Sequence, residues 1–177
     1  MLEFKGYDIP NTVDELTIKQ FDEVNYYENN NELAPLEKWI EKFKLLGLPE
    51  EVFDDMTADD FKQLVKDWNN GFNNDIDKIT EVEIDGYTYK TKETLGVKDI
   101  SLIEKVWKSN VKEFASETCA ILFKRDDLNR TEHYADAHIK HKKSLFKSQP
   151  CKLIIPYITD ILEVITKSAE NVTKELE

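Results

Sequence analysis

The clearest pattern in the chain is an alternation of apolar and polar residues over 79–91, on both sides of an Asp85-Gly86 pair. The apolar positions in this alternation are Val82, Ile84, Tyr87 and Tyr89. A period of two residues around an Asp-Gly pair is typical of a β-hairpin with a type I′ turn, because glycine tolerates the positive φ that this turn needs. The sequence therefore predicts a central β-hairpin at 79–91.

Most of the remaining chain carries apolar residues at helical spacing. The ranges with this spacing are 17–27, 35–46, 58–68, 97–108, 111–123, 131–146 and 151–176, with a short helical turn at 50–55. Thr17 with Gln20, and Thr57 with Asp60, have the spacing of capping boxes at helix starts. We therefore predict an α+β fold that is predominantly helical, with about six to seven helices, one hairpin and an N-terminal strand at 2–9.

The hairpin has a counterpart near the N-terminus. Residues 4–9 (FKGYDI) resemble residues 84–89 (IDGYTY) at an offset of 80. Residues 16–21 (LTIKQF) resemble residues 95–100 (LGVKDI) at an offset of 79. A nearly constant offset is the signature of an internal duplication. Two unrelated strand–loop–helix units would give the same pattern, so both interpretations stay open.

Charge divides the chain into two parts. Residues 1–77 contain 19 acidic and 7 basic side chains, a net charge of −12, whereas residues 78–177 contain 17 of each. The run 69–77 between them (NNGFNNDID) has the Asn-rich composition of a linker. We therefore divide the chain into an acidic helical part at 1–72 and a part at 73–177 that holds the hairpin and a long C-terminal helix. The two parts can still pack as one domain.

Composition limits the cellular compartment in which we expect the protein and the classes of partner that it can bind. No apolar run approaches the roughly 18–20 residues of a membrane span. The start, Met1–Lys5, lacks the basic region and apolar run of a signal peptide, so we expect the protein in the cytosol. Cys119 and Cys151 are then expected to be reduced thiols. The acidic first part would repel phosphates, which disfavours direct binding to nucleic acid.

Two features near the C-terminus predict a protein interface. Residues 138–152 carry five lysines and no acid, and the range 151–176 carries one apolar stripe. Pro156 removes a backbone donor early in that range, so we expect a kink or a restart there. The candidate interface residues are Lys140, Lys142, Lys143, Lys147, Lys152, Ile158, Ile161, Leu162 and Ile165. The alternative is that the lysines coat a solvated helix face.

The residues show no catalytic constellation. There is no GxGxxG, P-loop or GxSxG motif, and Cys119, Cys151, His138 and His141 lack the spacing of a zinc site. The acids around residues 54–60 are explained by a helix start, where they favour the macrodipole. The residues Trp39, Trp68 and Trp107 sit at core spacings and are interpreted as packing. We therefore predict no catalytic residues, no cofactor and no metal.

Several short segments resemble small structural and assembly proteins of tailed bacteriophages. These segments are IP at 9–10, VDELTIKQF at 13–21, IDGYTY at 84–89, LGVKDI at 95–100 and AILFKR at 120–125. The similar families include head-to-tail and tail proteins, tail assembly chaperone-like chains and chains of crAss-like phages. The resemblance implies a protein that acts through its surface contacts, so it assigns no functional residues to this chain.

The leading expectation is a non-enzymatic phage protein that acts through protein–protein contacts in virion assembly. Its expected partners are other phage structural proteins or further copies of itself, in the host cytoplasm and in the virion, with no membrane involved. An alternative is an acidic, DNA-mimic-like module that binds and inhibits a host protein. A hydrolase is a third hypothesis, and it would need two converging carboxylates in a closed cleft.

Overall fold

The computed structural model describes residues 1–72, 76–91, 95–109, 111–161 and 163. The predicted α+β class with a helical majority is confirmed. The first half contains β1 (Leu2–Phe4), β2 (Tyr7–Ile9), α1 (Ile18–Asn29), α2 (Pro35–Leu45), α3 (Glu51–Asp54) and α4 (Ala58–Asn70). The second half contains β3 (Glu81–Ile84), β4 (Tyr87–Lys90), α5 (Val97–Ser109), η1 (Val111–Glu113), α6 (Phe114–Leu122), β5 (Lys124–Arg125), α7 (Arg130–His133), α8 (Asp136–Phe146), η2 (Cys151–Leu153) and a helix at 155–161.

The predicted hairpin is confirmed as the antiparallel pair β3–β4. Ile84 pairs with Tyr87, and the two turn residues Asp85 and Gly86 have φ of 52° and 77°. Positive φ at both central residues is the geometry of a type I′ turn. β5 adds a third strand beside β4, which the sequence pattern did not predict because it is only two residues long.

The single N-terminal strand predicted at 2–9 is wrong, because the segment is itself a hairpin. Phe4 pairs with Tyr7, and Lys5 and Gly6 form the turn with φ of 49° and 83°. Lysine is uncommon at a turn position with positive φ, so the Lys-Gly pair gave a weaker turn signal than Asp-Gly.

The two hairpins are followed by helix starts with the same hydrogen bond. The Thr17 N–H donates to Gln20 Oε1 at 3.0 Å, and 79 residues later the Gly96 N–H donates to Asp99 Oδ2 at 3.0 Å. In each case the side chain three residues into the helix satisfies the backbone donor at the cap. This recurrence supports an internal duplication, which stays a prediction.

Two predicted helices differ from the observed ones. The range 131–146 is divided at Tyr134 and Ala135 into α7 and α8, and the cap of α7 is Asn129, whose side chain accepts from the Thr131 and Glu132 N–H groups. In the predicted 151–176 helix, η2 ends before a new helix begins at residue 155. Pro156 therefore lies in a first helical turn, and the predicted restart is confirmed. Residues 162 and 164–177 of that prediction lie outside the described residues.

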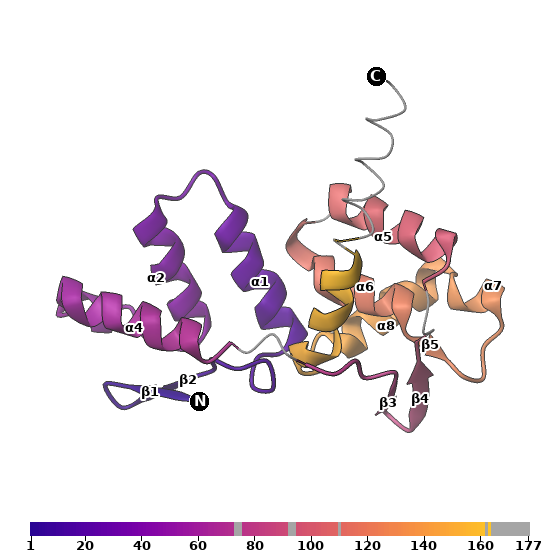
Figure 1. Ribbon diagram of the computed structural model, residues 1–177, viewed down its shortest axis with the longest axis horizontal. Helices are drawn as coiled ribbons and strands as arrows, with labels where there is room; N and C mark the ends of the chain where they lie inside the picture. Colours follow the sequence, from indigo (N-terminus) through magenta and orange to yellow (C-terminus); the bar gives the residue numbers. More distant parts are fainter. Residues whose placement is uncertain (73–75, 92–94, 110, 162, 164–177) are drawn as a thin grey trace, which may run out of the picture.

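The two halves meet along α1, which lies between α2 on one side and η1 and α6 on the other (Figure 1). A strap formed by residues 147–151 also runs beside residues 16–19. In it, the carbonyls of Gln149 and Lys147 accept from the Ile18 and Lys19 N–H groups at 2.8 and 3.0 Å. Apolar residues of both halves, from Ile9 to Ile161, form one buried cluster.

The segment that follows the first hairpin, Pro10-Asn11, lies against the end of α4 in a close contact at Gly71. A Cβ atom at this position would lie 2.2 Å from Asn11 Nδ2 and 2.3 Å from the Asn11 backbone oxygen. The neighbouring Trp68 Nε1–H donates to the Pro10 carbonyl at 2.9 Å. Glycine is therefore required at residue 71 by space, since its φ of −74° suits any residue.

We predict that Gly71→Ala lowers the free energy of unfolding by about 1–3 kcal/mol, because the chain at Asn11 must move to admit the methyl group. Urea denaturation measures this change. Asn70→Ala, at the exposed preceding residue, is the matched control and should change stability by less than about 0.5 kcal/mol. Equal effects of the two variants would contradict the close contact.

Candidate functional site

A groove follows one face of α1 and is made of two hollows. One, of about 290 Å³, lies between α1, α2 and α4; the other, of about 180 Å³, lies between α1, α5, α6 and the helix at 155–161. Phe21 and Asn25 line both hollows, so the two are neighbours along α1. We call these two hollows the α1 groove.

All three tryptophans of the chain line the α1 groove. Trp39 and Trp68 lie in the larger hollow with ring centroids 5.8 Å apart, and Trp107 lies in the smaller one with its centroid 4.9 Å from that of Phe114. Trp68 is buried, as the packing interpretation expected, but Trp39 and Trp107 are half-buried. Partly exposed tryptophans in a groove are typical of protein-binding surfaces.

The lining of the larger hollow includes a buried cation. Lys42 is 3% exposed, and its Nζ lies 4.1 Å from the centre of the Trp39 ring while pairing with the Glu28 carboxylate. A cation above an indole face is attracted by the ring electrons. Lys42 therefore fixes the Trp39 ring, and its own charge is already compensated inside the chain.

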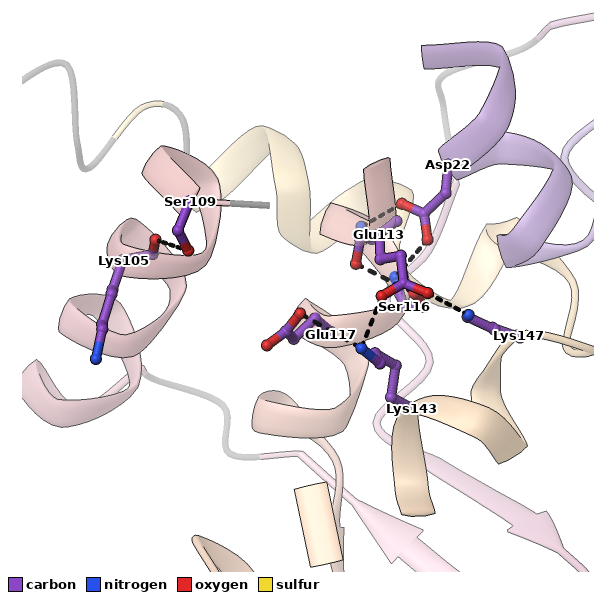
Figure 2. A network of polar contacts seen from close by, with 9 residues as sticks. Asp22, Lys105, Ser109, Glu113, Ser116, Glu117, Lys143 and Lys147 are labelled. Atoms are coloured by element: carbon purple, nitrogen blue, oxygen red, sulfur yellow. Dashed lines mark hydrogen bonds and ion pairs between the residues drawn. The ribbon is translucent and has the colours of Figure 1, made fainter. Parts of the chain in front are cut away.

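A carboxylate at the wall of the smaller hollow joins the halves (Figure 2). Asp22 of α1 accepts from the Ala115 N–H at 2.6 Å and from the Ser116 N–H at 3.1 Å. These donors belong to the first turn of α6, whose N-cap residue Glu113 makes no side-chain cap. Asp22 thus caps α6 from another helix, where a negative charge also favours the macrodipole. Burial raises the pKa of Asp22 to about 6, against the lowering effect of these hydrogen bonds.

Most of the predicted interface lysines are engaged within the chain. Figure 2 shows Lys143 and Lys147 directed at Glu113, with Nζ–Oε distances of 2.8 and 2.5 Å. Lys152 pairs with Asp14 at 2.5 Å, while Lys140 is exposed. Three of the five lysines therefore pair with acids of the same chain, two of them within the C-terminal half and one, Lys152, with an acid of the first half.

The assignment of Lys142 to an exposed interface is wrong, because its side chain is fully buried. Its Nζ donates to the Phe123 carbonyl at 3.2 Å and lies 2.8 Å from His133 Nδ1. His133 Nε2 in turn lies 3.0 Å from the Ile121 carbonyl. Burial lowers the pKa of Lys142 to about 7, and burial together with Lys142 lowers the pKa of His133 to about 4. The lysine pattern could not reveal a buried member of the run.

The predicted apolar interface residues have different positions. Ile158 lines the smaller hollow of the α1 groove, and Ile161 is 1% exposed in the core. Leu162 and Ile165 lie outside the described residues. The sequence therefore predicted one residue of the groove, but missed the aromatic side chains that form most of it.

A third cavity, of about 300 Å³, lies in the second half and is lined by two carboxylates, Asp99 and Asp126. Asp99 accepts from the Tyr134 hydroxyl and the Gly96 N–H, and Asp126 pairs with Lys90 at 2.8 Å. Both acids thus have structural partners, which does not favour a hydrolase. Among the described residues, no group of three or more His, Cys, Asp and Glu side chains could hold a metal ion.

Comparison with known proteins adds no relative: no family model, no curated protein and no solved structure matches the chain. Within the described part, none of the helices combines the length and apolar character needed to cross a membrane. The α1 groove and the sequence pattern are therefore the features from which a function can be proposed.

The buried Asp22 should make stability depend on pH. Because its pKa is about 6 in the folded state, against an ordinary value of 3.8 in the unfolded chain, its contribution to stability is complete below pH 4 and falls as pH rises to 6. Asparagine does not ionise, so Asp22→Asn removes this loss. We therefore predict that the free energy of unfolding of Asp22→Asn, relative to that of wild type, rises by up to about 2–3 kcal/mol between pH 4 and 6. Urea denaturation at each pH measures it, and a constant difference would contradict the prediction.

Lys142 should act in the opposite direction at higher pH. With a folded-state pKa of about 7 and an ordinary value of 10.5 in the unfolded chain, its contribution to stability is complete above pH 10.5 and is lost as pH falls to 7. We predict that wild type gains about 1 kcal/mol per pH unit over Lys142→Met between pH 7 and 8.5. Cys119 and Cys151 are common to both chains and cancel in this comparison. Parallel pH profiles would show that Lys142 is not buried as described.

Proposed function

We propose that this chain is a non-enzymatic protein that acts through contacts with other proteins in the assembly of a tailed-phage virion, as a tail or head-tail component or as an assembly chaperone. The observation that carries the proposal is the α1 groove, with Trp39 and Trp107 half-buried in its two hollows. Large aromatic side chains at the edge of a hollow supply most of the binding energy at many protein interfaces.

The shape of the groove favours a protein ligand over a small molecule. Its two hollows are shallow neighbours on either side of Phe21, and each has room for a few side chains rather than for an enclosed metabolite. The exposed Asn29 and Asn69 side chains, one in each hollow, can exchange hydrogen bonds with the polar rim of a partner. This combination of apolar centre and polar edge is the usual anatomy of a protein interface.

The phage assignment rests on the resembling segments, and the expected places of action are the host cytoplasm and the virion. Two of these segments, 13–21 and 95–100, lie at the starts of α1 and α5, where they supply the caps of both helices. The segment at 120–125 joins α6 to β5. The resemblance therefore concerns the scaffold that places α1, and the groove supplies the contact surface.

Capture from an infected-cell lysate tests the proposal. We expect the immobilised full chain to retain a virion protein, identified by mass spectrometry, and Trp107→Ala to retain at least about tenfold less because it removes an anchor. Tyr87→Ala, an exposed aromatic outside the groove, is the control and should behave as wild type. Thermal melting checks that both variants are folded. Capture of no virion protein, or equal capture by Trp107→Ala, would contradict the proposal.

A second candidate function is supported by the acids of α3 and α4. Residues 50–60 expose six carboxylates, those of Glu50, Glu51, Asp54, Asp55, Asp59 and Asp60. Lys44 pairs with Glu50 and Lys62 with Asp59, which leaves the segment strongly negative. An exposed acidic face is what a DNA-mimic-like inhibitor of a host protein would need. Competition between the chain and labelled DNA for host DNA-binding proteins decides between the two functions.

A further inference from the structure

We propose that the α1 groove binds an amphipathic helix of a partner protein, whose apolar face enters both hollows and whose flanks are basic. This inference rests on the proposed function and deepens it by naming the chemistry of the partner. The two hollows lie on either side of Phe21, so the bound helix crosses α1 and places one apolar anchor on each side.

The apolar lining of two neighbouring hollows favours a helix. Trp39 and Phe72 line one hollow, Trp107 and Ile158 line the other, and Phe21 lines both. Such a two-hollow groove suits the i, i+3, i+4 and i+7 side chains of one helical face, which form a single continuous ridge. A lone extended strand would need an open sheet edge beside it, whereas this groove is formed by helices.

Charge complementarity favours basic flanks. The charged residues that line the described part of the groove are Asp22, Glu28 and Lys42; Lys42 is 3% exposed and pairs with Glu28, so these two charges balance and the remaining charge of this lining is the carboxylate of Asp22. No exposed cation in the described lining therefore offsets the −12 charge of residues 1–77. Attraction to this negative charge speeds the association of a basic ligand and orients it before it binds.

A peptide titration tests the proposal on the full chain. The probe is an 18-residue helical peptide without tryptophan, with leucines on one face and lysines on the other, and its counterpart carries glutamates in place of the lysines. Because all three tryptophans line the groove, their emission reports binding directly. We expect saturable binding of the lysine peptide and at least about tenfold weaker binding of the glutamate peptide.

Matched variants locate the binding. Asn25 lines both hollows, so Asn25→Lys should weaken the lysine peptide about tenfold, whereas Asn25→Glu should keep or raise its affinity. Gln63→Lys adds the same charge on an exposed position of α4 outside the groove and should change affinity less than about threefold. Equal effects of Asn25→Lys and Gln63→Lys would mean unspecific attraction to the acidic half and would overturn the proposal.

Other occupants of the groove give different results. If the double variant Ile165→Asp/Val172→Asp of the full chain binds the lysine peptide about tenfold more tightly than wild type, the groove belongs to the chain's own C-terminal segment. If the chain forms a dimer and Asn25→Lys dissociates it, the groove belongs to a second copy. Either result overturns the proposal. If the lysine peptide does not bind but the chain still captures a virion protein, only the proposal of a helical partner is overturned. Peptide binding without that capture instead overturns the phage role.

Discussion

The fold depends on a buried carboxylate that one half of the chain supplies to the other. Asp22 of α1 receives the first backbone donors of α6, and α6 has no side-chain cap of its own. A buried charge is tolerated only when hydrogen bonds satisfy it, so the positions of α1 and α6 are determined together. Lys143 and Lys147 form ion pairs with Glu113 at the same helix start. The acidic and the neutral parts of the sequence therefore meet at one polar centre.

This arrangement leaves α1 with two packed sides and one face towards solvent. The packed sides carry buried residues such as Ile18 and Val24, while Phe21 and Asn25 remain accessible between aromatic rings from both halves. The larger hollow is lined by residues of the first half alone, whereas the smaller hollow forms only where α1 meets α5, α6 and the helix at 155–161. A molecule that binds across both hollows therefore also favours the joined state of the two halves. Binding across both hollows and the contact between the two halves are therefore coupled.

The sequence predicted the parts of the fold that local rules determine. The Asp-Gly turn, the Thr17 and Thr57 caps and the restart at Pro156 each depend on residues a few positions apart. The N-terminal hairpin was missed because Lys5 occupies a conformation that lysine rarely adopts. The groove and the burial of Lys142 could not be predicted, because they arise when segments far apart in the chain pack together. No local pattern distinguishes a lysine that faces His133 from one that faces water.

The strap at 147–151 makes the two similar helix starts unequal. At α1, the carbonyls of Lys147 and Gln149 hold the first amides, and Ile18 is fully buried. At the corresponding position of α5, Val97 is 86% exposed. The first turn of α5 is instead held by the buried Asp99, which accepts from the Tyr134 hydroxyl, whereas the first turn of α1 opens only when the strap separates from it. Opening of the α1 start is thus linked to the end of α8 through backbone hydrogen bonds, whereas the α5 start is secured by a side chain of its own helix.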